Sequence, residues 1–270
     1  MYTIMSDSLA VDVLNPETDR DRFGLRYCTG GYIFQIRRGG KTPLLTGPTY
    51  PDTFVPVHGQ GFPDTFNHVP LFIADEDLFM ITGIGKCDLK NGKIIELTHW
   101  DVEKKDDEIK FRTIHKFSSY EYTLTRRIKV SGDKVISHTT MENRGKTYVP
   151  VSWYPHPFFP PKEEGLVFTL KTPFSFENET GFFRKEGNGI YKNRGIEESK
   201  SFQVMKTESV LHVLADNDTY ECEMKTDYIS AHTPVWANDN TSSIEPYYDT
   251  TLFPGCTKEW TVSYEFRYKD

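Results

Sequence analysis

The strictest constraint on this chain is its hydrophobic period, which alternates at every second residue and never settles into a helical repeat. Near the end of the chain, Val262, Tyr264, Phe266 and Tyr268 would lie on one face of a strand, with polar residues between them. No window keeps a 3.6-residue apolar period over three turns. The pattern therefore favours strands throughout and argues against any sizeable helix.

Similar alternation, interrupted by turns rich in Gly, Asn and Asp, predicts many further strands. The expected strands cover residues 32–36, 94–100, 109–117, 122–130, 135–141, 149–153, 166–170, 210–214, 220–224 and 229–236. Three stretches do not fit the pattern: residues 1–30 are polar and broken, 46–70 predict a long irregular loop, and 173–200 predict an excursion rich in Gly, Asn and Glu. Many short strands with regular turns predict an all-β sandwich or barrel.

Charge and cysteine usage limit the compartment and the partners. A formal net charge of −7 argues against nucleic acid as a partner, because phosphate binding needs a basic face. No apolar run approaches the ~18 residues of a membrane span, and the N-terminal segment lacks the features of a signal peptide. The four cysteines are widely separated, which is typical of free thiols in a reducing compartment. We therefore expect a cytoplasmic monomer or homodimer without membrane contact.

One segment, Val149–Pro161, begins as a strand and then meets four prolines within seven residues. His156 lies between Pro155 and Pro157, which hold the backbone extended. An imidazole on such a stiff segment, with aromatic neighbours, is a plausible titratable group in a cleft, since histidine titrates near neutral pH. A buried structural histidine in a proline-rich corner explains the same residues, and both interpretations stay open.

A second segment has the same construction. Glu245 follows a short apolar pair and leads into Pro246 and two tyrosines, an unusual place for a solvated surface charge. A buried glutamate that accepts backbone N–H bonds is the alternative. With an ordinary pKa of about 4.3 a glutamate is an available base at pH 7, and a histidine near 6.5 can carry a proton as the acid. Glu245 and His156 thus form a coherent base and acid.

Other chemistries find less support in the sequence. The histidines show no HxH, HExxH or HxxxH spacing, which argues against a metal site. Neither a GxSxG nucleophile motif nor a glycine-rich nucleotide cradle occurs. The carboxylates at Asp75, Glu76 and Asp77 are more typical of a solvated turn than of a glycosidase pair, although sequence does not exclude the pair.

At these motifs the chain resembles the aldose 1-epimerase (galactose mutarotase-like) family. His156 in WYPHPFF is similar to the second histidine motif of that family, and VWANDN running into SIEPY, with Glu245, is similar to its terminal glutamate motif. His58 in HGQGF resembles the upstream histidine-glycine loop. The resemblance covers roughly residues 20–268 and implies one domain, residues 1–270, with the fold of a β-supersandwich of two large twisted antiparallel sheets.

The resemblance also implies a reaction that needs no cofactor and no metal. Glu245 would take the proton of the anomeric hydroxyl of a sugar, and His156 would protonate the ring oxygen. His58 would hydrogen-bond the sugar, while Trp236 and Phe62 would offer faces for stacking. Trp153 is expected in the core.

The chain departs from the family pattern at the upstream loop, where both the arginine and the longer Asn-His-Leu-His-Gly-Gly form are missing. This favours a free hexose over a sugar phosphate, with Arg26 or Arg37 left as candidates to enter the cleft from elsewhere. The function expected is therefore an aldose 1-epimerase that interconverts α and β anomers. A non-catalytic sugar-binding or regulatory protein on the same fold is the main alternative. A lyase or hydrolase domain fits less well, because such enzymes usually add a further domain.

Overall fold

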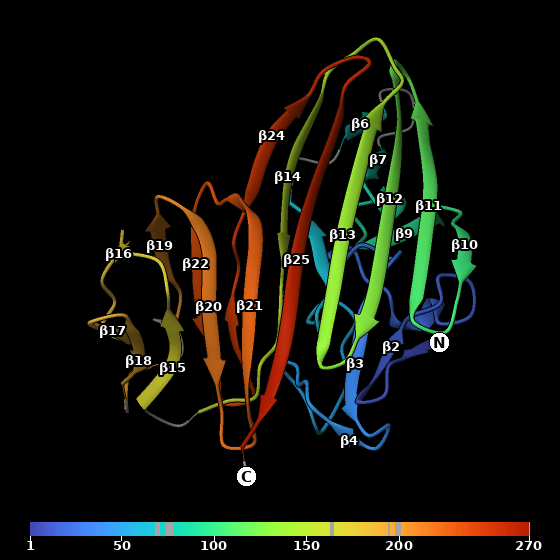
Figure 1. Ribbon diagram of the computed structural model, residues 1–270. Coiled ribbons are helices and arrows are strands. Elements are labelled where there is room, and N and C mark those ends of the chain that lie inside the picture. The colour runs from blue at the N-terminus through green and yellow to red at the C-terminus, as the bar shows by residue number, and fades with distance from the viewer. Residues whose placement is uncertain (68–70, 74–77, 163–164, 194, 198–200, 270) are drawn as a thin grey trace.

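In the computed structural model, one extended antiparallel sheet organises the rest of the chain (Figure 1). The described residues are 1–67, 71–73, 78–162, 165–193, 195–197 and 201–269. In spatial order, the sheet contains β10 (Asp101–Lys104), β11 (Glu108–Phe117), β12 (Tyr120–Ser131), β13 (Lys134–Asn143), β25 (Thr257–Tyr268), β21 (Tyr220–Ile229), β20 (Val210–Asp216), β15 (Gly165–Leu170), β18 (Gly189–Lys192) and β17 (Phe183–Glu186).

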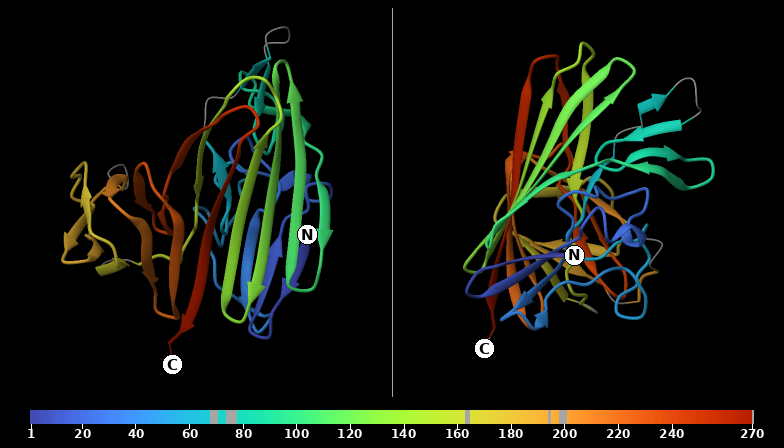
Figure 2. Two further views of the ribbon diagram at one scale, coloured as in Figure 1. Left: turned by 45° about the horizontal axis from the view of Figure 1, so that its top comes forward. Right: turned by 90° about the vertical axis from the view of Figure 1, so that its right-hand side faces the viewer.

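Smaller antiparallel sheets complete the fold. They are β1 (Tyr2–Met5), β2 (Leu9–Val13), β3 (Ile33–Arg38) and β4 (Thr42–Pro43); β6 (Leu71–Ile73), β7 (Leu78–Ile81), β8 (Gly85–Asp88) and β9 (Lys93–Leu97); β24 (Tyr248–Leu252), β14 (Val149–Pro155) and β5 (Asp64–Phe66); and β16 (Phe174–Phe176), β19 (Gln203–Thr207), β22 (Thr233–Ala237) and β23 (Ser242–Ile244). Figure 2 (right) shows the long strands nearly edge-on, with the blue and cyan N-terminal elements mostly on one side of them.

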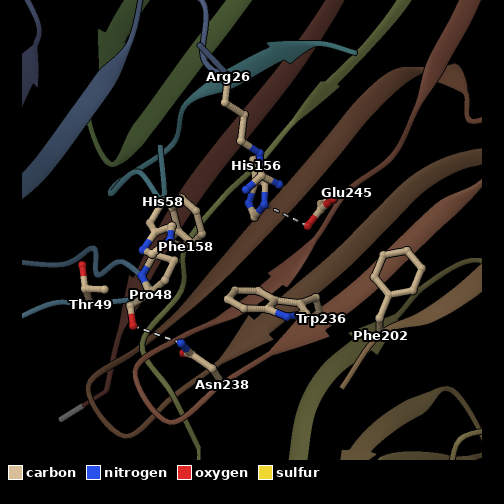
Figure 3. Close-up of a pocket in the computed structure, with 10 residues that line it drawn as sticks. All are labelled: Arg26, Pro48, Thr49, His58, His156, Phe158, Phe202, Trp236, Asn238 and Glu245. Carbon is tan, nitrogen blue, oxygen red and sulfur yellow. Dashed lines mark hydrogen bonds and ion pairs between the residues drawn. The ribbon is translucent and has the colours of Figure 1, made fainter. Parts of the chain in front are cut away.

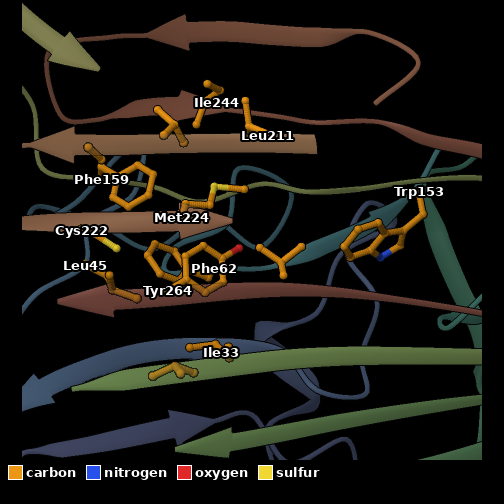
Figure 4. Packing of buried hydrophobic residues seen from close by; sticks show 14 of the residues in the cluster. Ile33, Leu45, Phe62, Trp153, Phe159, Leu211, Cys222, Met224, Ile244 and Tyr264 are labelled. Carbon is orange, nitrogen blue, oxygen red and sulfur yellow. The ribbon is translucent and has the colours of Figure 1, made fainter. Parts of the chain in front are cut away.

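The core lies where the alternating apolar faces of these sheets meet. On β25, Trp260, Val262, Tyr264 and Phe266 are buried in alternation with more exposed residues, as their period predicts. Figure 4 shows Tyr264 packed among side chains from several sheets. Trp153 of β14 is fully buried in the same cluster. The expectation of an all-β fold and of a core position for Trp153 is therefore confirmed.

The N-terminal stretch that the sequence presents as polar and broken forms β1 and β2, so that expectation is wrong. β2 lies between β1 and β3, and all five of its residues are buried. Its polar residue, Asp12, accepts hydrogen bonds from both Arg37 and Thr3, which removes the cost of burying the carboxylate. A strand buried on both faces has no alternating pattern, and this hid β2 from the sequence.

The other two irregular stretches are partly regular. Residues 46–67 are mostly irregular, as expected, but β5 pairs with β14 at the end of this segment, with Asp64 opposite Pro155. The stretch from 173 contains β16 and the β17–β18 hairpin, which turns at Gly187 with a φ of 58°. The only helix in the described part of the chain is the short 3₁₀ turn η1 (Arg20–Arg22). Accordingly, no described helix has the length and hydropathy of a membrane span.

A buried ion pair ties β5 to the large sheet. Arg126 of β12 is fully buried, and its guanidinium donates to Asp64 of β5 and to Ser137 and Thr139 of β13. Arginine cannot lose its proton inside a protein, so its charge needs a partner wherever it is buried. The pair thus fixes β5, and through β5 the end of β14, against the large sheet.

We predict that Asp64→Asn lowers the free energy of unfolding by about 3–5 kcal/mol, because it leaves the Arg126 charge buried and uncompensated. Urea denaturation at pH 7 measures this loss. The matched control is Asp101→Asn, whose pairing with Arg112 at 3.9 Å is exposed, and which we expect to cost less than about 1 kcal/mol. Equal losses in the two variants would contradict a structural role for the buried pair.

Candidate functional site

The two proline-ended segments meet through a single backbone bridge. Phe159 and Ser242 exchange both of their hydrogen bonds at 3.0 Å. His156 lies three residues before this bridge and Glu245 three residues after it. Glu245 is further fixed by its N–H, which donates to the carbonyl of Pro234 on β22 at 2.8 Å. Side chains 89 positions apart in the sequence are thereby brought to one place.

The His156 and Glu245 side chains are in direct contact. The Nε2 atom of His156 is 3.2 Å from Oε1 of Glu245 (Figure 3), and both residues are buried, at 3% and 5% exposed. The other ring nitrogen, Nδ1, is 3.2 Å from the hydroxyl of Ser243, which also hydrogen-bonds Glu245. Ser243 therefore orients both members of the pair.

The prolines of the histidine segment leave its backbone pairing intact. The N–H groups of His156 and Phe158 donate to the carbonyls of Pro63 and Gly61, at 2.8 and 2.9 Å. Pro155 and Pro157 occupy the alternate positions, whose missing N–H groups would face away from this partner. The proline spacing thus leaves a stiff, paired backbone beneath the imidazole.

The upstream loop depends on glycine. Gly59 and Gly61 both have a φ of 78°, and a Cβ on Gly61 would come within 2.4 Å of the carbonyl oxygen of Ile33. The loop is also held by Tyr27, whose hydroxyl donates to the carbonyl of His58 at 2.9 Å. These contacts place the exposed His58 side chain beside the histidine segment.

These segments enclose a cavity of about 440 Å³. Its lining residues are Arg26, Pro48, Thr49, His58, His156, Phe158, Phe202, Trp236, Asn238 and Glu245 (Figure 3). Four of the five residues singled out from the sequence, His58, His156, Trp236 and Glu245, line it together. In the described part of the chain no group of three His, Cys, Asp or Glu side chains could hold a metal ion. The carboxylates at 75–77 lie outside the described residues.

Phe62 is the exception among the residues singled out. It is 2% exposed and packs in the core against Tyr264 at a ring-centroid distance of 4.3 Å and against Phe159 at 5.2 Å. The positive φ of Gly61 reverses the chain just before it and turns its ring toward the large sheet. The expectation that Phe62 offers a stacking face to a sugar is therefore corrected.

Arg26 enters the cavity from the segment before β3, whereas Arg37 is paired with Asp12 outside it. The Arg26 guanidinium hydrogen-bonds Tyr154 and lies 5.2 Å from the centre of the Tyr27 ring. Sequence showed no specific signal for Arg26, because it lies in the irregular segment before β3 and belongs to no motif. Phe202 and Asn238 were also not singled out from the sequence.

Burial shifts both pKa values of the central pair away from the ordinary values that the sequence suggested. It raises the pKa of Glu245 to about 7, an effect that Arg26 and the Ser243 hydroxyl oppose. Burial also lowers the pKa of His156 well below its usual range, and the positive charge of Arg26 lowers it further. Below about pH 7 the pair therefore holds one proton, and that proton is on Glu245.

We predict that the free energy of unfolding of the Glu245→Gln variant increases relative to that of the wild type as the pH rises from 5 to 8. The folded pKa of about 7 lies above the ordinary 4.5, so the contribution of Glu245 to stability is complete below 4.5 and is lost as pH rises through 7. Glutamine stays neutral and avoids this loss, on the order of 1–3 kcal/mol. Thermal and urea unfolding across the pH range measure it. Glu208→Gln, at an exposed position, is the control, and a pH-dependent gain for Glu245→Gln no larger than that of this control would contradict the raised pKa.

Comparison with known proteins found no matching family model and no matching curated protein at the sequence level. Solved structures match over nearly the whole chain. A galactose mutarotase-like protein from Lactobacillus casei superimposes with a TM-score of 0.68 and 14% identity, covering 99% of this chain and 100% of that one. A putative aldose 1-epimerase from Escherichia coli K12 has a TM-score of 0.61 and 15% identity, covering 99% of each chain.

A galactose 1-epimerase from Lactobacillus acidophilus is also similar, with a TM-score of 0.58 and 11% identity over 99% of this chain and 94% of that one. At sequence identities this low, the similarity shows a shared arrangement of strands and does not show the chemistry of the site. The fold expected from the short histidine and glutamate motifs is confirmed: the chain has the galactose mutarotase-like fold.

Proposed function

We propose that the protein is an aldose 1-epimerase that interconverts the α and β anomers of a free hexose by acid-base ring opening and closure. The observation that carries the proposal is the buried contact between His156 and Glu245, at 3.2 Å in the wall of a sugar-sized cavity. The fold shared with proteins named as aldose 1-epimerases supports it. The reaction requires only proton transfer and positioning.

Glu245 is the base in this mechanism. In its ionised form it takes the proton from the anomeric hydroxyl, and the C1–O5 bond breaks as C1 becomes an aldehyde carbon. A pKa of about 7 suits the task, because a base titrating near the working pH combines availability with strength. Arg26 opposes the effect of burial and so helps to keep the carboxylate available.

His156 is the acid and protonates the ring oxygen as the bond breaks. It acquires the proton from Glu245 across their direct contact, which converts the neutral pair into carboxylate and imidazolium. Rotation about C1–C2 then presents the other face of the aldehyde. On ring closure His156 takes back the proton of the O5 hydroxyl and Glu245 returns a proton to O1, so the pair ends as it began.

The remaining polar groups hold the sugar in place. Arg26 and His58 line the cavity beside the pair and are available to bind hydroxyl groups. Arg26 brings a positive charge to a cavity whose upstream motif has no arginine, but it already hydrogen-bonds Tyr154. A single arginine so engaged favours a neutral hexose over a phosphorylated one.

We predict that Glu245→Gln and His156→Asn each lower the anomerisation rate by ~10²-fold or more with the fold retained. Polarimetry on freshly dissolved α-anomers of glucose, galactose, xylose and glucose 6-phosphate measures the rate and identifies the substrate. Glu208→Gln and His99→Asn are the exposed controls and should match the wild type. An unchanged rate in either site variant would remove that residue from the mechanism, and no acceleration by the wild type would refute the activity.

We predict that activity survives exhaustive treatment with EDTA. The mechanism derives all of its proton transfers from Glu245 and His156 and gives no step to a metal ion. The test compares the initial rate of anomerisation before chelation, after chelation, and after Zn²⁺ or Mg²⁺ is added back. Activity lost on chelation and restored by one of the metals would overturn the mechanism.

A further inference from the structure

We propose that the protein binds an extended peptide segment of a partner protein along an open edge of β11, at residues 114–117. The segment lies in a second cavity of about 440 Å³, between β11 and the sheet of β6–β9. None of the described residues that line this cavity also lines the one around His156 and Glu245. Figure 2 (right) shows the turquoise strands of the smaller sheet diverging from the green strands β11 and β12. Binding here is therefore independent of the proposed function.

The open edge exists because β10 is shorter than β11. β10 pairs with β11 only from Asp101, opposite Arg112, to Lys104, opposite Ile109. Before Asp101 the chain comes from β9, which pairs with β8 in the smaller sheet. Residues 113–117 of β11 therefore keep β12 as a neighbour on one side, and in the described part of the chain no strand pairs with them on the other.

Two residues of this edge direct their backbone groups toward the cavity. The N–H of Lys105 donates to the carbonyl of Glu108 at 2.8 Å, which shows that Glu108 faces the β10 side. In an antiparallel ladder this direction alternates along the strand, so Ile114 and Lys116 face the same side as Glu108. Both residues line the cavity, and neither forms a backbone hydrogen bond with a described residue on that side. Their N–H and C=O groups are thus a template for pairing with an added strand.

The surroundings of the edge favour one extended chain over a whole second sheet. Met80, Lys86 and Glu96 are cross-strand neighbours in the smaller sheet, and all three line the cavity. Thr98, another lining residue, hydrogen-bonds the hydroxyl of Thr113 at 2.8 Å and so joins the two sides of the cavity. Walls on both sides accommodate a single peptide strand and hinder the sheet edge of a second copy of this protein.

The side chains along the edge specify what the peptide carries. His115 is 2% exposed, and its Nε2 accepts a hydrogen bond from the N–H of Gly83 at 3.1 Å. Burial lowers the pKa of His115 to about 4, so the ring is neutral with its proton on Nδ1, and this N–H donates to no described residue. A peptide residue opposite His115 points to the same side as the imidazole, where an asparagine oxygen can accept this hydrogen bond. Ile114, 47% exposed, and the exposed Lys116 favour an apolar and an acidic residue opposite them.

The experiment titrates the isotope-labelled protein with the peptide acetyl-Thr-Glu-Asn-Val-Thr-amide and follows the amide NMR signals. Antiparallel pairing sets Glu opposite Lys116, Asn opposite His115 and Val opposite Ile114. N-methylation of the Glu or the Val nitrogen removes a donor that faces β11, so we expect each to weaken binding on the order of ten-fold. N-methylation of the Asn nitrogen, which faces away from β11, is the matched control and should leave tighter binding than the other two. Equal weakening by all three, or no shift of the signals of residues 114–117 at millimolar peptide, would overturn the proposal.

Charge reversal tests the position of the peptide on the edge. Lys116→Glu should weaken binding of the same peptide by about five-fold, the equivalent of a surface ion pair, and a peptide with Lys in place of Glu should recover it. Lys110→Glu is the matched control, because Lys110 lies on the same face of β11 where β10 covers the edge. An equal effect of the two variants, or no recovery with the exchanged peptide, would contradict binding at this edge.

Amide hydrogen exchange tests the edge without any peptide. In the protein alone, the amides of Ile114 and Lys116 should exchange with solvent on the order of ten-fold faster than those of Thr113 and His115, which face β12. Saturating peptide should slow the first two and leave the others unchanged. Comparable protection of all four amides in the protein alone would show that the edge is closed, and the site would then be refuted.

Discussion

The site depends on one backbone interaction, the bridge between Phe159 and Ser242. These two hydrogen bonds join the segment that leaves β14 to the strand that precedes Glu245. The bridge sets the distance between His156 and Glu245, because each lies three residues from it, while further backbone hydrogen bonds to Pro63 and Pro234 fix each residue separately. The buried ion pair of Arg126 and Asp64 also stabilises this part of the fold. It fixes β5, and β5 pairs with the end of β14 that leads into His156.

Burial gives this arrangement its chemical character. In water, a histidine and a glutamate have their ordinary pKa values. Here burial raises the pKa of Glu245 and lowers that of His156. The two shifts reverse the usual order of the two pKa values, so that the pair holds its proton on Glu245 rather than on His156. The positive charge of Arg26 limits the rise in the pKa of Glu245. Arg26 therefore affects the electrostatics of the pair in addition to lining the cavity.

Period-two alternation in the sequence predicted the long strands of the large sheet and the all-β class, because each of those strands has one buried and one exposed face. The same rule failed at β2, which is buried on both faces. His156 and Glu245 were predictable from the residues because each precedes a proline, whereas His58 and Trp236 were named through the family resemblance. The place of Phe62, and the choice of Arg26 over Arg37, were not predictable, because the positive φ at Gly61 and the path of the chain before β3 are decided by tertiary packing.

The aromatic lining of the cavity is positioned by the same strands. β22 carries Trp236 and pairs with β23, which leads into Glu245. The Trp236 ring lies 6.2 Å from the imidazole of His156, with the two rings edge to face. The strand pairing that builds the fold therefore also places an aromatic ring beside the buried pair.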